Sequence, residues 1–91
     1  MTRNEAVKKH IGDKCNDIIA YVDKRIEESM LQFEPYIYIS DKDIMGVIKD
    51  DNKEKIDTIL KYLEFHYDER GYYCSCDLEH DHLLTIAWFL L

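Results

Sequence analysis

The sequence has very few of the residues from which enzymes build tight loops, with three glycines and one proline in 91 residues. It contains no GxSxG element and no glycine-rich loop that could cradle a phosphate. Cys15 falls within an apolar stripe, which favours packing over a role as a nucleophile. We therefore predict that the protein is not an enzyme and carries no cofactor.

Long apolar runs are also missing. The amino terminus, MTRNEAVKKH, lacks the apolar core of a signal peptide. The C-terminal run LLTIAWFLL is about half as long as a membrane span. Three cysteines, an odd number without a secretory signal, fit free thiols in a reducing compartment. These absences predict a cytoplasmic protein that makes no contact with a membrane.

Positive charge is scarce, because 12 basic residues stand against 19 acidic ones and the formal net charge is −7. Such a field disfavours polyanions and favours a partner with a basic surface. A hydrophobic fraction of 46% is sufficient for a packed core. A chain of this length forms one compact unit, so we expect a single domain over residues 1–91.

The first third of the chain has the pattern of one long amphipathic helix. Thr2 and Glu5 have the spacing of a capping box at its start. Pro35 ends it, because the residue before a proline is disfavoured in helical conformation. Apolar residues between these limits recur every three or four positions and predict one buried face. They are Val7, Ile11, Cys15, Ile18, Val22, Ile26, Met30 and Phe33.

The next segment alternates aromatic and β-branched residues over Tyr36–Ile39, which predicts a short strand. Ser40 then has the position of a helix cap, with Asp43 at the third helical residue. The inner face of this second helix is predicted from its apolar positions. They are Ile44, Val47 and Ile48.

A third helix is predicted after a turn at residues 50–52, with Asp51 or Asn52 as its cap. Gly71 ends it, because glycine readily adopts the left-handed conformation. Two strands, Tyr72–Asp77 and Leu83–Leu91, follow as a hairpin that turns near 78–81. The apolar face of the third helix is made by five positions. They are Ile56, Ile59, Leu60, Leu63 and Tyr67.

This order of elements resembles the winged helix-turn-helix family. The segment Ser40–Ile44 resembles the polar cap that opens the family's second helix. Leu60–Leu63 and Gly71–Tyr73 resemble the leucine-rich end of the third helix, the glycine and the first wing strand. The resemblance implies a small α+β domain with a winged-helix-like layout: a long N-terminal helix, a short strand, two helices and a C-terminal β-hairpin.

The resemblance also implies a way of binding DNA, in which the third helix enters the major groove with its amino-terminal residues leading. The corresponding residues of this chain are Asn52, Lys53, Lys55 and Thr58, with Lys61 further along. Carboxylates crowd the same end of that helix, and the turn at 77–81 is acidic. Because duplex affinity comes largely from phosphate neutralisation, a winged-helix DNA-binding regulator is the alternative interpretation and not the leading one.

The leading interpretation is a non-enzymatic protein-binding module whose carboxylates imitate a phosphate backbone, as a DNA mimic does. Small acidic bacteriophage proteins that inhibit or modulate host nucleic-acid-handling enzymes, including anti-CRISPR and other counter-defence proteins, are similar in size and charge. The plain alternative is a solvated acidic surface. The candidate contact residues are Asp41, Asp43, Asp50, Asp51, Glu54 and Asp57, with Tyr36, Tyr38 and Tyr62 as aromatic anchors.

Two further hypotheses concern the C-terminal hairpin. Cys74, Cys76, His80 and His82 could place thiolate and imidazole ligands around one zinc ion. The alternative is two small buried thiols and two exposed turn histidines. The apolar run LLTIAWFLL could instead pair at a sheet edge and make a homodimer.

Overall fold

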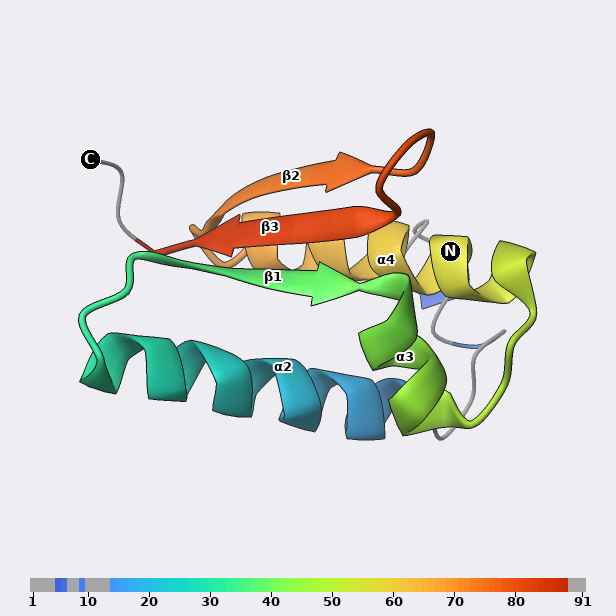
Figure 1. Cartoon of the computed structure of the whole chain (residues 1–91), viewed down its shortest axis with the longest axis horizontal. Helices are drawn as coiled ribbons and strands as arrows, with labels where there is room; N and C mark the ends of the chain where they lie inside the picture. The colour runs from blue at the N-terminus through green and yellow to red at the C-terminus, as the bar shows by residue number, and fades with distance from the viewer. Residues whose placement is uncertain (1–4, 7–8, 10–13, 89–91) are drawn as a thin grey trace.

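Three helices pack on one face of a three-stranded antiparallel sheet in the computed structural model (Figure 1). The structure describes residues 5–6, 9 and 14–88. Its elements follow in the predicted order of a helix, a strand, two helices and a hairpin. They are α2 (Lys14–Leu31), β1 (Tyr36–Ser40), α3 (Asp41–Ile48), α4 (Lys53–Asp68), β2 (Tyr73–Asp77) and β3 (Leu83–Ala87).

The last strand of the chain is the central strand of the sheet, whose order is β1-β3-β2. Both neighbours pair with β3 in antiparallel register, so that Tyr38 and Ser75 each lie opposite Thr85. The C-terminal apolar run was considered as a segment that could pair at a sheet edge in a dimer, and the structure contradicts this possibility for Leu83–Ala87. Both sides of this segment are already occupied by β1 and β2.

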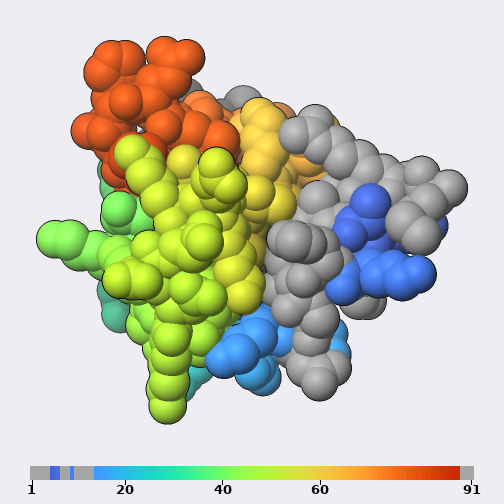
Figure 2. All heavy atoms as spheres, turned by 90° about the vertical axis from the view of Figure 1, so that its right-hand side faces the viewer, coloured from blue at the N-terminus to red at the C-terminus, as the bar shows by residue number. Residues whose placement is uncertain are grey.

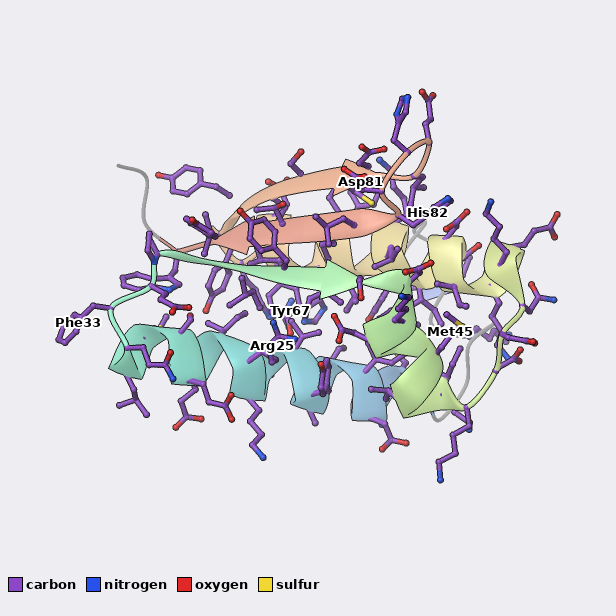
Figure 3. The ribbon with its side chains drawn as sticks, viewed as in Figure 1. Arg25, Phe33, Met45, Tyr67, Asp81 and His82 are labelled. Carbon is purple, nitrogen blue, oxygen red and sulfur yellow. The ribbon has the colours of Figure 1, made fainter. Side chains whose placement is uncertain are left out.

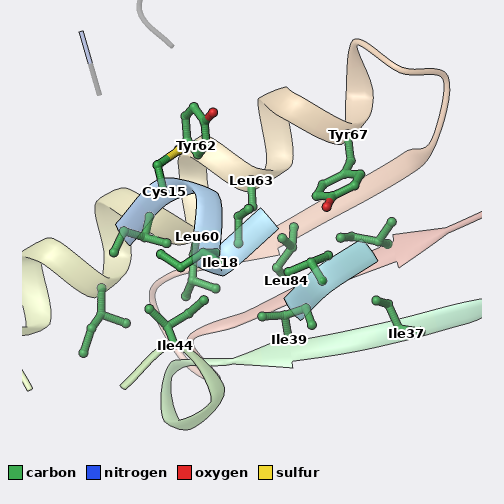
Figure 4. Close-up of a cluster of buried hydrophobic side chains, with 14 of the residues drawn as sticks. Cys15, Ile18, Ile37, Ile39, Ile44, Leu60, Tyr62, Leu63, Tyr67 and Leu84 are labelled. Atoms are coloured by element: carbon green, nitrogen blue, oxygen red, sulfur yellow. The ribbon is translucent and has the colours of Figure 1, made fainter. Parts of the chain in front are cut away.

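The core lies between the sheet and the helices, and the helical stripes predicted its members well (Figure 4). Cys15, Ile18, Val22 and Ile26 of α2 are buried. All five residues predicted for the inner face of the third helix are buried too, as are Ile44 and Ile48 of α3. The alternation of β1 directs Ile37 and Ile39 inwards.

The carboxyl end of the first helix differs from the prediction. Met30 is 41% exposed and Phe33 is 87% exposed, so neither extends the buried stripe. The helix ends at Leu31, and Phe33 follows in a turn with a left-handed φ of 57° that directs its ring into solvent (Figure 3). Ser29 is buried in place of these residues. Thr2, Val7 and Ile11 lie outside the described residues. The capping box predicted for Thr2 with Glu5 and these two stripe positions therefore stay predictions.

The helix caps predicted from local sequence are confirmed at α3 and α4. Ser40 caps α3 in a full capping box with Asp43. Asn52 caps α4 and accepts a hydrogen bond from the Lys55 N–H at 3.0 Å. Gly71 has a φ of 91° after α4, as the sequence predicted.

Candidate functional site

Some of the carboxylates predicted to form one binding surface are engaged in contacts within the chain, and the half-buried Asp43 is one of them. Its Oδ2 accepts the Ser40 N–H at 2.9 Å, and its Oδ1 accepts the Tyr21 hydroxyl at 3.1 Å. Arg25 also lies 3.8 Å from Oδ2. Asp43 therefore stabilises the start of α3, and its role as a partner-binding residue stays a prediction for a carboxylate that is already hydrogen-bonded within the chain.

Asp50 is also engaged within the chain. It accepts the Asn52 N–H at 2.9 Å and pairs with the Lys55 amine at 3.2 Å. The backbone hydrogen bond from Asn52, followed by Lys55, lowers the pKa of Asp50 below its ordinary value. Lys55 is consequently held beside a carboxylate, which reduces the positive charge available to neutralise a DNA phosphate.

Asp57 joins the hairpin to α4. The Nδ1 atom of His82 lies 3.1 Å from Asp57 Oδ1. The carbonyl of His82 accepts the Asp41 N–H at 3.1 Å, which also ties the hairpin to the start of α3. His82 adopts a left-handed φ of 48° to make both contacts. One turn residue thus connects β3, α3 and α4.

A pocket of about 280 Å³ opens where these three elements meet. Its polar lining comes from Asp41, Asp51 and Asp57, with Lys53 and His82 beside them. Met45 and the buried Ile56 supply apolar surface. We call this pocket and its lining the junction pocket. Apolar surface combined with carboxylates suits a long side chain that ends in a cation.

The solvent-facing carboxylates lie around the junction pocket. Asp51 and Glu54 are exposed, and no ion pair within the described part of the chain involves either of them. A second, more open hollow lined by Met45, Lys49, Asp50 and Asp51 continues from it. Figure 2 views this side of the molecule, with α3 and the start of α4 in yellow-green below the orange-red β2–β3 turn.

The three predicted aromatic anchors do not lie together. Tyr36 and Tyr38 are exposed on the outer face of the sheet, with ring centroids 5.2 Å apart. Tyr62 is only 5% exposed and packs beside Cys15 (Figure 4). Its prediction as a surface anchor is wrong, because its position on α4 faces the core. The predicted contact residues therefore belong to two surfaces and to the interior.

The lysines predicted to meet DNA are also dispersed. The Lys61 amine lies 2.8 Å from Glu64, and Lys55 pairs with Asp50. The Thr58 hydroxyl donates to the Glu54 carbonyl at 2.7 Å, so it is used within the helix. Lys53 lines the junction pocket. Each of these cations has carboxylates close by.

The residues considered for zinc do not form a ligand set. Burial, followed by the charges of nearby carboxylates, raises the pKa of the Cys74 and Cys76 thiols to about 11. His80 is exposed beside Asp77, while His82 contacts Asp57. Within residues 5–6, 9 and 14–88, no group of three or more such side chains could hold a metal ion. The zinc prediction is therefore corrected.

Met45 and His82 were not identified from the sequence as residues that line a pocket. Met45 carried no polar signal, and His82 was considered only as a zinc ligand. Its contact with Asp57 joins positions 25 residues apart in the sequence. No local pattern could predict this contact, since it depends on how the hairpin packs against α4.

Comparisons with protein-family models, with curated proteins and with solved structures found no significant match. No helix in the described residues is long and apolar enough to cross a membrane. The geometry of the junction pocket and the charge around it therefore carry the functional argument.

Proposed function

We propose that the protein is a non-enzymatic protein-binding module that receives a basic side chain of its partner in the junction pocket. The observation that carries this proposal is the combination of apolar surface from Met45 and Ile56 with carboxylates from Asp41, Asp51 and Asp57. Arginine and lysine both bury an aliphatic stem while their charge remains near polar groups. Arginine fits best, because its planar guanidinium binds carboxylates in a fork.

The partner is a protein with a basic surface. A net charge of −7 accelerates encounter with such a partner and opposes approach to nucleic acid. Exposed Asp51 and Glu54 extend the negative surface beyond the pocket. Complementary charge of this kind contributes to specificity and to association rate more than to raw affinity.

The more specific form of the proposal is a small phage-type inhibitor or modulator of a host nucleic-acid-handling enzyme. Basic grooves that bind phosphates also accept carboxylates in similar positions. The order of elements supports this form, since it resembles winged helix-turn-helix domains while the surface near α4 carries the opposite charge from a DNA-binding one.

Charge reversal tests the proposal. The protein is used as bait in a bacterial lysate at low salt, and captured proteins are identified and titrated by calorimetry. Asp51→Lys combined with Glu54→Lys should weaken binding of the captured partner at least about tenfold. The matched control is Glu27→Lys with Glu28→Lys, which changes the same charge on exposed positions of α2. Equal binding by both double variants, or capture of no basic protein, contradicts the proposal.

The alternative is a winged-helix DNA-binding regulator. One observation favours it: Lys49 and Lys53 lie near the start of α4, and no ion pair in the described part of the chain involves them. A mobility-shift assay across salt concentrations discriminates, because phosphate-driven binding weakens steeply as salt rises. Salt-sensitive duplex binding that is lost in Lys53→Ala would favour the regulator.

A further inference from the structure

The two edges of the sheet differ in how they are protected. At β1, Arg25 donates to the Tyr38 carbonyl at 3.1 Å, and Asp43 accepts the Ser40 N–H at 2.9 Å. These side chains occupy backbone groups that a further strand would need. The β1 edge is therefore blocked by its own domain, as exposed edges in native proteins commonly are.

The pairing pattern shows which backbone groups face outwards at β2. Because the Tyr38 carbonyl points away from β3, the backbone of Thr85 points the other way, towards Ser75. Ser75 therefore bonds to β3, and its neighbours Cys74 and Cys76 direct their N–H and C=O groups to the open edge. In the part of the chain that the structure describes, no backbone group beyond the sheet and no side chain bonds to the backbone of Cys74 or Cys76.

The sequence of β2, YCSCD, also lacks the usual devices that discourage strand addition. It contains no proline and no lysine, which commonly protect edge strands. Tyr73 and Ser75 are exposed on the outer face, where the side chains of an added strand would meet them. This edge has the backbone geometry of a strand-addition site.

The charge around β2 identifies the kind of strand that fits. Asp68 and Glu64 lie close enough to Cys74 to raise the pKa of its thiol, in addition to burial. Burial and then Glu64, followed by Asp57 and Asp77, raise the pKa of the Cys76 thiol. Lys61 acts on the Cys76 thiol in the opposite direction, but its amine is paired with Glu64 at 2.8 Å. A second copy of the chain would bring the same carboxylates together, whereas a basic segment would neutralise them.

We propose that the open edge of β2 binds an extended lysine- or arginine-rich segment of a partner protein as a fourth strand of the sheet. The backbone of Cys74 and Cys76 supplies the hydrogen bonds, and the surrounding carboxylates select basic side chains. Asp57 also lines the junction pocket, but the backbone of Cys74 and Cys76 is not part of that lining, so the hydrogen bonds of this site do not depend on the pocket. Main-chain bonding provides affinity in this binding mode, and alternate side chains provide specificity.

The test uses nuclear magnetic resonance with a synthetic peptide of about six residues in which valine and lysine alternate. In the free protein, the Cys74 and Cys76 amides should exchange rapidly with solvent. Addition of the peptide should shift these resonances most and slow their exchange at least about tenfold. A peptide of the same charge that is N-methylated at every residue has no amide donor on either edge, so it cannot form the ladder and should leave them unchanged. Equal effects of both peptides would overturn the proposal, because they would reveal attraction by charge alone.

Two protein variants separate this site from the rest of the surface. Asp68→Lys should weaken peptide binding about threefold to tenfold, since it reverses charge beside β2 at the exposed end of α4. Glu27→Lys makes the same charge change on α2 and should leave binding within about twofold. Asp51→Lys changes the junction pocket and should also preserve peptide binding at β2. A failure of the β2 proposal can therefore be distinguished from a failure of the junction-pocket proposal. A dimer of the free protein with already protected Cys74 and Cys76 amides would overturn the proposal in favour of self-association.

Discussion

His82 and Asp57 form a part-buried contact of 3.1 Å that ties the hairpin turn to α4. Because an ionised carboxylate can only accept, the imidazole must donate from Nδ1. The same histidine receives the Asp41 N–H through its carbonyl. The position of the turn over the junction pocket therefore depends on one residue that contacts two helices.

We expect His82→Ala and Asp57→Ala each to lower the free energy of unfolding, with a coupling of about 1 kcal/mol between them. The coupling arises because each substitution removes the same hydrogen bond. A double-mutant cycle by urea denaturation measures it. Additive effects of the two substitutions would show that the contact contributes nothing to stability.

Tyr67→Phe should lower the free energy of unfolding by about 1 to 2 kcal/mol. The Tyr67 hydroxyl donates to Asp23 at 2.6 Å from a side chain that is 1% exposed. The substitution leaves the ring in the core and removes the hydroxyl's contacts with α2, which are the bond to Asp23 and a longer one of 3.4 Å to the Ile19 carbonyl. Tyr73→Phe is the control, because Tyr73 is exposed and should change stability by less than about 0.5 kcal/mol. Similar losses in both variants, measured by chemical denaturation, would contradict the assignment.

Alanine at the two described glycines should change stability in opposite directions. Gly71 has a φ of 91°, which disfavours a side chain, so Gly71→Ala should destabilise by about 1 kcal/mol. Gly46 lies within α3, and a Cβ atom there would meet nothing within 4 Å. Gly46→Ala should therefore stabilise by about 0.5 to 1 kcal/mol. Thermal unfolding of both variants checks the pair, and a shift of the same sign in each would be inconsistent with it.

Stability should fall as the pH rises from about 9 towards 11. The pKa values of the Cys74 and Cys76 thiols are raised from 9.0 to about 11 in the folded protein, mainly by burial. Their stabilising contribution is complete below the unfolded pKa and is lost as the pH rises through the folded pKa, because the unfolded chain releases these protons first. Burial and Asp23 also raise the pKa of Tyr67, which extends the decline above a pH of about 10.

Urea denaturation at about pH 8 and about pH 10, in the presence of a reductant, measures this decline. The variant Cys74→Ala with Cys76→Ala should show a shallower dependence, since two of the responsible groups are absent. A decline of equal slope in both proteins would attribute the effect to other groups.

Local patterns predicted the elements well and the surfaces poorly. Apolar spacing over Ile56–Tyr67 identified the buried face of α4, because helical periodicity is set by neighbouring residues. The same reasoning failed at Phe33, where the helix had already ended. Tyr62 was predicted as a surface anchor and is buried, because Cys15 of α2 lies beside it in the fold.

The amino-acid sequence by itself determined the order of helices and strands, the cap at Ser40, a cap at Asp51 or Asn52, and the excess of negative charge. These properties follow from interactions within a few residues or from composition alone. Only the tertiary structure decided that β3 lies between β1 and β2, that Asp43 accepts the Tyr21 hydroxyl of α2, and that His82 meets Asp57. Each of these depends on long-range packing, which brings together residues that are far apart in the sequence and share no local pattern.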